Sequence, residues 1–192
     1  MKRIYLFACF LIITRIATFA QWNEQMYSQY THNNYTTFEA FNRPIQAENY
    51  DAVLLEAAIL FETNRQRVDY GLSPLKYDYA LHICARNHSV DMVNYDFFSH
   101  TSVVPGKERM ADRLAEIGYR NCWCAENILY SPVKESYATT ARFLVENVWM
   151  NSEGHRKNIL NAKYTHLGAG IAFYYKDGWL MVKATQNFLC KE

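Results

Sequence analysis

Three residues whose side chains can bind a ligand or move a proton stand among large apolar neighbours in this 192-residue chain. His100 follows two phenylalanines, Glu126 lies beside Asn127 in an apolar segment, and His155 follows a glycine. A buried charge without a partner is too costly to persist, so buried polar groups gather where they satisfy one another. We therefore expect these three side chains to converge in one partly buried cleft, with Glu126 ionised and hydrogen-bonded to a histidine.

Two kinds of site suit two imidazoles and a carboxylate. Histidine and carboxylate ligands bind zinc, so His100, Glu126 and His155 could form a weak divalent-metal site. The same groups could instead form a satisfied polar cluster that shapes a binding groove. The sequence has neither the His-Glu-x-x-His motif of metalloproteases nor the Gly-x-Ser-x-Gly turn of serine hydrolases. The residues alone therefore favour binding or structure over catalysis.

Four further polar residues accompany this set. Asn127 and Ser152 are the ones we expect beside the three site residues. Asn64 and Arg67 lie about one turn apart on a predicted helix. They form either a surface pair or a brace under the cleft.

Residues 1–20 have the pattern of a cleaved export signal. Two basic residues precede an apolar stretch, and small residues lead to Ala20 before Gln21, where the mature chain should begin. Arg15 limits the apolar run to 11 residues, well below the ~20 that span a bilayer, which disfavours a membrane anchor. A lipid attached at Cys9 is also disfavoured, because almost no apolar segment precedes it. We expect an exported protein, extracellular or periplasmic, with no transmembrane segment in the mature chain.

Composition restricts the remaining function classes. Half of the residues are hydrophobic, enough for one well-packed core. The chain has 20 Lys and Arg against 19 Asp and Glu, and residues 1–20 contain three of the basic ones. The mature net charge is therefore about −2, which argues against nucleic acid as a partner because nucleic-acid sites are usually basic.

The mature chain divides into an extension, residues 21–50, and a domain, residues 51–190. The extension is polar and aperiodic but rich in aromatic side chains, so we interpret it as an irregular strap on the domain surface. In the domain, helical spacing begins at Asp51 and stops at Gly71, and further helices are predicted over 76–94, 110–117 and from Ser131-Pro132 onward. Strands are predicted over 122–130, 167–174 and 179–188, the last two joined by a turn at Asp177-Gly178. This order predicts an α+β layered domain.

Four cysteines remain in the mature chain: Cys84, Cys122, Cys124 and Cys190. An even number in an exported protein predicts two disulfides, and four cysteines allow three pairings. Zinc is the alternative, but Cys-x-Cys lacks the usual ligand spacing and no second close pair exists. Cys122 and Cys124 are too close along an extended strand to bridge each other comfortably.

Five motifs are informative in combination: Asn64-Arg65-Gln66-Arg67, Phe98-Ser99-His100, Ala125-Glu126-Asn127-Ile128, the run from Trp149 to Leu160, and Thr185-Gln186-Asn187-Phe188. Together they resemble the CAP superfamily of cysteine-rich secretory, antigen 5 and pathogenesis-related proteins, in its compact bacterial form. The resemblance covers about residues 52–188. It implies a three-layer α-β-α sandwich with a central antiparallel sheet and a cleft across its top, with His100 and Glu126 as cavity residues.

The chain departs from eukaryotic members at two positions. Ser152 stands where they have a second cavity glutamate, and Lys163 where they have a second histidine. The resemblance implies that His155 occupies the vacant space. It also implies that Cys124 pairs with Cys190, which leaves Cys84 for Cys122.

The resemblance does not fix the activity, since members are described as lipid or sterol binders, toxins, defence factors and envelope components. We predict a non-catalytic module that binds a lipid-like, glycan or protein ligand in its cleft or interacts with the envelope. The alternative is a metal-assisted hydrolase of envelope polymer or peptide, with weakly bound zinc or magnesium at His100, Glu126 and His155.

Overall fold

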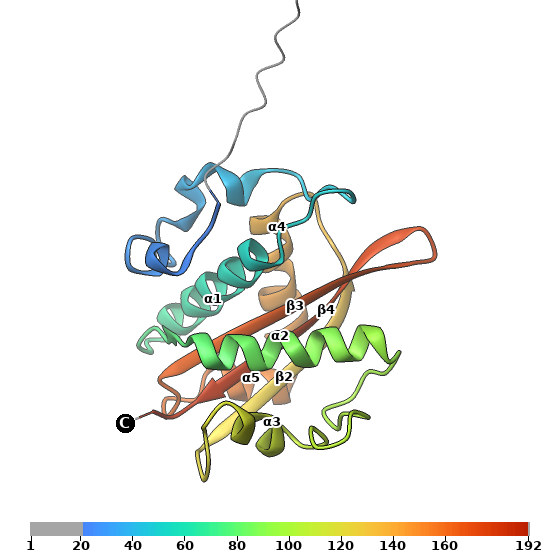
Figure 1. The fold of residues 1–192 in the computed structure, drawn as a ribbon. Coiled ribbons are helices and arrows are strands. Elements are labelled where there is room, and N and C mark those ends of the chain that lie inside the picture. The colour runs from blue at the N-terminus through green and yellow to red at the C-terminus, as the bar shows by residue number, and fades with distance from the viewer. Residues whose placement is uncertain (1–20, 192) are drawn as a thin grey trace, which may run out of the picture.

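The computed structural model describes residues 21–191, so the predicted export signal lies outside the described residues. Within that range, a four-stranded sheet in the order β1-β3-β4-β2 forms the middle layer (Figure 1). The strands are β1 Lys76–Tyr77, β2 Cys124–Pro132, β3 His166–Lys176 and β4 Trp179–Leu189. β2, β4 and β3 pair antiparallel, but β1 pairs parallel with β3. The predicted antiparallel sheet is therefore present, with the two-residue strand β1 added in parallel at one edge.

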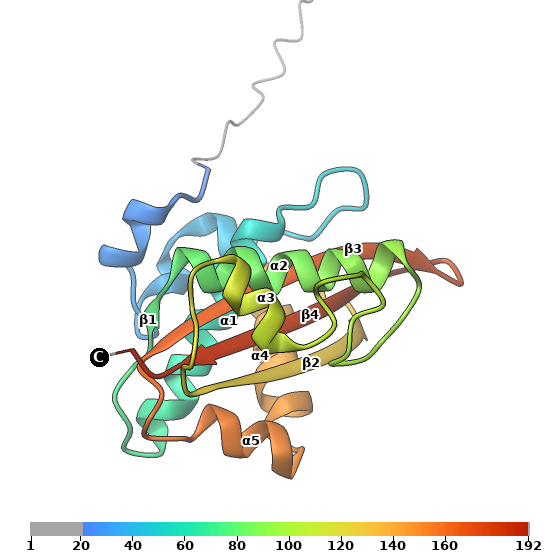
Figure 2. The same ribbon diagram turned by 60° about the horizontal axis from the view of Figure 1, so that its bottom comes forward.

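Helices cover both faces of this sheet, which confirms the predicted three-layer α+β architecture (Figures 1 and 2). α2 and α3 lie on one face, with α1, α4, a π-helical segment and α5 on the other. Their bounds are α1 Ala52–Asp69, α2 Tyr79–Asn94, α3 Met110–Glu116, α4 Tyr137–Arg142, the π-helical segment Phe143–Trp149 and α5 Glu153–Ile159. No helix within residues 21–191 is both long and apolar enough to cross a membrane.

Two predicted helix starts were wrong. α2 begins at Tyr79, after an Asp78 side chain that accepts a hydrogen bond from the Leu81 amide, because Lys76 and the residue after it pair with β3. The helix predicted from Ser131-Pro132 begins only at Tyr137, because β2 continues to Pro132. Ser136 caps this helix instead, through a hydrogen bond from the Thr139 amide to its hydroxyl.

Successive residues of β2 point to opposite faces of the sheet. Glu126 lies opposite Asn187 and faces α2 and α3, where its contacts lie. Asn127 lies opposite Gln186 and faces α1 and α5. β2 is an edge strand, so groups from both faces can approach each other only around its open side.

α2 packs directly on the backbone of β3, at Gly168 and Gly170. A Cβ built on Gly170 would lie 2.0 Å from the backbone nitrogen of Arg86, and one on Gly168 would lie 2.2 Å from the backbone nitrogen of His82. The Ser89 hydroxyl donates to the Gly170 carbonyl at 3.0 Å across this contact. Glycine is therefore required here by the close approach of helix and strand.

Replacing Gly170 with alanine should destabilise the fold by about 1–3 kcal/mol, because the added methyl group forces α2 away from the sheet. The free energy of unfolding in urea measures this effect. Gly154→Ala is the matched control, since a Cβ there meets nothing within 4 Å, and it should leave stability unchanged or slightly higher. Equal stability of the two variants would contradict this packing.

Residues 21–50 pack on α1 as an irregular segment with short 3-10 helices Glu24–Ser28, Tyr35–Thr37 and Glu39–Asn42 (Figure 1). Trp22, Tyr35 and Phe41 are at most 4% exposed. Their rings surround Phe61 of α1, with centroids 5.2–6.2 Å away. The segment therefore contributes to the hydrophobic core.

Candidate functional site

Glu126 is the centre of a buried ionic cluster. Its side chain is 3% exposed, and its two oxygens have different partners. His100 Nδ1 donates to Oε1 at 2.9 Å, and Arg113 Nη2 donates to Oε2 at 2.6 Å. His88 Nε2 lies 3.9 Å from Oε1. The predicted hydrogen bond between Glu126 and a histidine is present, and His100 is that histidine.

The surroundings of Glu126 keep it ionised. Burial by itself would raise the pKa of Glu126, but the His100 hydrogen bond and the Arg113 charge together hold that pKa below its usual value. Burial has the opposite consequence for His88, whose pKa falls to about 4, and the charge of Glu126 only partly offsets it. His88 is therefore neutral at physiological pH, and the cluster contains one carboxylate against the Arg113 guanidinium.

Arg113 is the main residue of the site that the sequence reading missed. It projects from α3, is 3% exposed, and also donates to the carbonyl groups of His100, Lys107 and Glu108. It thus holds the loop carrying His100 against Glu126. A signal was present, because Arg113 lies at helical spacing from Met110 and Ile117, on the face predicted to be apolar.

His155 lies close to this cluster without joining it. Burial lowers the pKa of His155, and the charge of nearby His100 lowers it further. Its Nδ1 is buried without a hydrogen-bond partner, and among the described residues its ring makes no hydrogen bond or ion pair to Glu126. His155 is on α5, across the edge of β2 from His100.

Asn127 fixes the position of α5. Its Nδ2 donates to the His155 carbonyl at 3.2 Å and to Gln186 Oε1 at 3.1 Å, and its Oδ1 accepts from Asn158 Nδ2 at 2.8 Å. Gln186 in turn donates to the Thr63 hydroxyl at 2.7 Å. Asn127 is therefore a site residue, but it acts on the opposite face of the sheet from Glu126.

The remaining predicted residues have structural positions. Ser152 precedes α5, and its carbonyl accepts from the Arg156 amide at 2.8 Å. Asn64 exchanges two hydrogen bonds with the Leu75 backbone. Arg67 is 2% exposed and donates to four carbonyl groups, those of Ser73, Ile159, Asn161 and Tyr164. Asn64 and Arg67 are thus a buried brace, and Arg67 holds the segment that follows α5.

The predicted metal trio does not fit a metal centre. Between residues 21 and 191, no three His, Cys, Asp or Glu side chains are grouped closely enough to hold an ion. Both oxygens of Glu126 already accept hydrogen bonds, one of them from a guanidinium that repels a cation. His100 and Glu126 therefore meet in a polar cluster, His155 lies outside it, and the three do not form a ligand set.

The structure does not contain the predicted disulfides, Cys124–Cys190 and Cys84–Cys122. All four cysteines of residues 21–191 have free thiols. Cys124 lies opposite Leu189 in the sheet and packs with Cys84 and Cys122 on the α2 and α3 side. Cys190, the next residue along, packs in the main core on the other side. Because adjacent strand residues face opposite ways, a bridge from Cys124 to Cys190 is unfavourable in this register.

Comparisons with known proteins give a consistent family. Residues 60–188 match the model of the CAP, or cysteine-rich secretory protein, family. The chain is 39% identical over 134 residues to the uncharacterised membrane protein YlbC of Bacillus subtilis, which covers 70% of this chain and 34% of that protein. It is 35% identical over 136 residues to the uncharacterised protein YkwD of the same species, a match that covers 71% of this chain and 47% of that protein. The chain thus spans about a third to a half of these curated relatives.

A solved structure supports the same assignment. The crystal structure of an extracellular protein containing an SCP domain, from Bacillus anthracis, superposes with a TM-score of 0.58 at 32% sequence identity. The match covers 73% of this chain and 41% of that one. The region that matches the family model contains the β2 strand, the Glu126 cluster and α5. The chain therefore belongs to the cysteine-rich secretory protein (CAP) family.

Proposed function

We propose that this protein is an exported CAP-domain module that binds a ligand beside the Glu126 cluster without catalysing a reaction. One observation supports this most strongly. The carboxylate of Glu126 is held by Arg113 and His100, so it is neither a free base nor an available metal ligand. General-base chemistry needs a group within reach of the substrate proton, and this group is occupied.

His100 supplies the binding contact. Its side chain is 57% exposed, and in residues 21–191 its Nε2 has no protein partner while Nδ1 is fixed by Glu126. His155 lies close by, but its Nδ1 is buried, and burial lowers the pKa of this ring. The ligand classes that an exposed imidazole nitrogen suits include the polar group of a lipid-like molecule, a glycan hydroxyl and a peptide carbonyl.

The predicted export signal over residues 1–20 supports an extracellular or periplasmic location for this module. The Bacillus anthracis protein that shares its fold is described as extracellular. A metal-assisted hydrolase of envelope polymer or peptide is the alternative, and the geometry of Glu126 argues against it.

The test uses purified residues 21–192. Soluble peptidoglycan fragments, phosphatidylglycerol vesicles and zinc chloride are added separately, and binding is measured by calorimetry together with product release. We expect one of the two organic probes to bind, and His100→Ala to weaken that binding at least about tenfold by removing a contact worth ~1.5 kcal/mol. Tyr95→Ala, a change at an exposed side chain outside the Glu126 cluster, is the control.

Two results would refute the proposal. Turnover of either organic probe that EDTA abolishes would establish the hydrolase instead. Equal binding by the wild type and His100→Ala would place the ligand elsewhere on the domain.

A further inference from the structure

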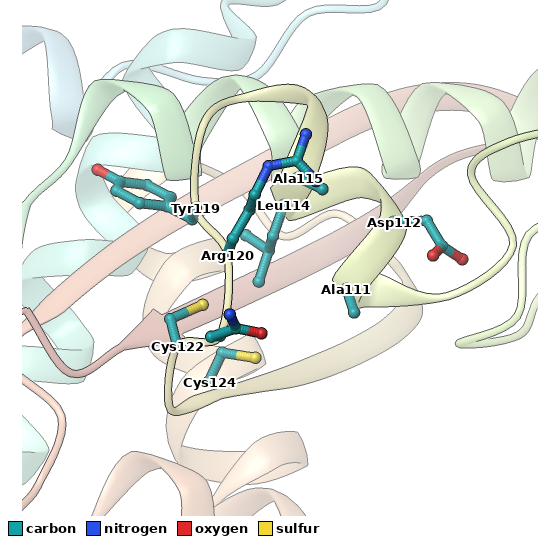
Figure 3. A pocket seen from close by; sticks show the side chains of 9 residues that line it. Ala111, Asp112, Leu114, Ala115, Tyr119, Arg120, Cys122 and Cys124 are labelled. Atoms are coloured by element: carbon teal, nitrogen blue, oxygen red, sulfur yellow. The ribbon is translucent and has the colours of Figure 1, made fainter.

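Cys122 and Cys124 lie side by side at a surface cavity of about 460 Å³ between α3 and the loop that leads into β2 (Figure 3). Both side chains line that cavity and are partly exposed. The two thiols are close enough for Cys122 to raise the pKa of Cys124. Neighbouring thiols at an accessible cavity can be joined or separated without rearranging the core.

The backbone explains how residues two apart come together. The sequence argument against a bridge assumed that both cysteines belong to an extended strand. β2 begins only at Cys124, and Cys122 is in the preceding loop. Asn121 has φ of +52°, a left-handed conformation that turns the chain just before this pair. The pair therefore lies at the start of β2, just after a turn, with Cys124 in the strand and Cys122 before it.

We propose that Cys122 and Cys124 form a reversible disulfide by exchange with an external disulfide compound. The Cys122 thiolate attacks one sulfur of the compound, breaks its S–S bond and releases the first thiolate. Cys124 then attacks Cys122 Sγ, the mixed disulfide breaks, and the second thiolate leaves. The protein loses two electrons and two protons, which the compound gains as it becomes two thiols.

The surroundings assign the two roles. Burial and the nearby Cys122 raise the pKa of Cys124 to about 11. Cys124 therefore keeps its proton, so we assign Cys122 as the attacking group and Cys124 as the group that resolves the mixed disulfide. A bridge between residues two apart closes a small ring, and strained, exposed disulfides are the ones readily reduced.

The other two cysteines are not equivalent partners. Cys84 packs behind the pair in the same small cluster but is 3% exposed. Burial raises the pKa of Cys84 to about 12, so its thiolate is rare. Cys190 is on the opposite side of the sheet.

Peptide mapping tests the proposal directly. Purified residues 21–192 are equilibrated with reduced and oxidised glutathione at several ratios, blocked with N-ethylmaleimide and digested with trypsin. The sequence gives one peptide, 121–134, containing both cysteines, whereas Cys84 falls in 77–86 and Cys190 in 184–191. We expect peptide 121–134 to change from two labels to an internal disulfide as the proportion of oxidised glutathione rises. It should return to two labels when that proportion falls.

Two variants separate the roles. Cys124→Ser should accumulate glutathione on Cys122 at least about tenfold more than Cys122→Ser does on Cys124, since only Cys122 is an effective nucleophile. Cys190→Ser is the matched control and should switch as the wild type does. A cross-link between two of the peptides, a fully labelled 121–134 at every ratio, or an internal bond that native reduction cannot open would each overturn the proposal.

Discussion

Replacing Arg113 with methionine should destabilise the protein by about 3–5 kcal/mol, the range measured when one partner of a buried ion pair is removed. Both side chains of the Arg113–Glu126 pair are 3% exposed, so solvent cannot compensate for the loss. The variant also leaves the carbonyl groups of His100 and Lys107 without this donor. The free energy of unfolding in urea at pH 7 measures the effect.

The pH dependence of this variant separates charge from packing. In the wild type the pKa of Glu126 is lowered, so its ionisation stabilises the fold above the unfolded-state pKa, and this contribution disappears as the pH falls through the folded-state value. Without Arg113, burial dominates and raises that pKa. Protonation of Glu126 then removes the uncompensated charge. The difference in unfolding free energy between the variant and the wild type should therefore be smaller at pH 5 than at pH 7.

Two controls complete this test. Arg113→Met combined with Glu126→Gln should recover part of the lost stability, because the buried charge is gone. Arg109→Ala removes an exposed arginine of the same region that pairs with Asp112, and it should change little. If the difference in unfolding free energy did not change with pH, packing rather than charge would explain the loss of stability.

The sequence predicted the individual helices, strands and turns better than the way in which they pack together. The helix from Asp51 begins after that residue, whose side chain caps it. The turn at Asp177-Gly178 has positive φ at both residues, as its type requires. These features depend on local chemistry, so a local pattern is sufficient to find them.

Features that depend on distant segments were missed. The strand Lys76–Tyr77 exists only because it pairs with His166 and Leu167, about ninety residues later. Ser131-Pro132 has the local chemistry of a helix start, yet Pro132 ends an edge strand, where a missing amide costs little. In both cases tertiary pairing overrides local preference.

The candidate site shows the same division. Glu126 and its hydrogen bond to a histidine were predicted, because a carboxylate in an apolar strand needs a partner. The sequence argument then grouped Glu126 with Asn127 and His155, although adjacent strand residues face opposite ways. Asn127 binds α5 on one face, and Glu126 binds Arg113 on the other. The choice of Arg113 as partner depends on how α3 docks, which no local pattern specifies.

Replacing Phe41 with alanine should cost about 3–5 kcal/mol, although this residue lies outside the segment that matches the family model. Phe41 is completely buried, with ring centroids of Trp22 and Tyr35 each 5.1 Å away and that of Phe61 at 6.2 Å. The cavity left behind would be bounded by large rigid rings, which cannot collapse to fill it. Urea unfolding measures the loss of stability.

Phe98→Ala is the matched control for this change, because Phe98 is 44% exposed and its removal leaves no closed cavity. Limited proteolysis supplies a second readout. If residues 21–50 are part of the core, Phe41→Ala should accelerate cleavage within this segment and lower the unfolding midpoint together, since Tyr35 also bonds Glu62 of α1 across the same contact. Faster cleavage with an unchanged unfolding midpoint would show that residues 21–50 detach independently. Their aromatic side chains would then cover the domain without forming part of its core.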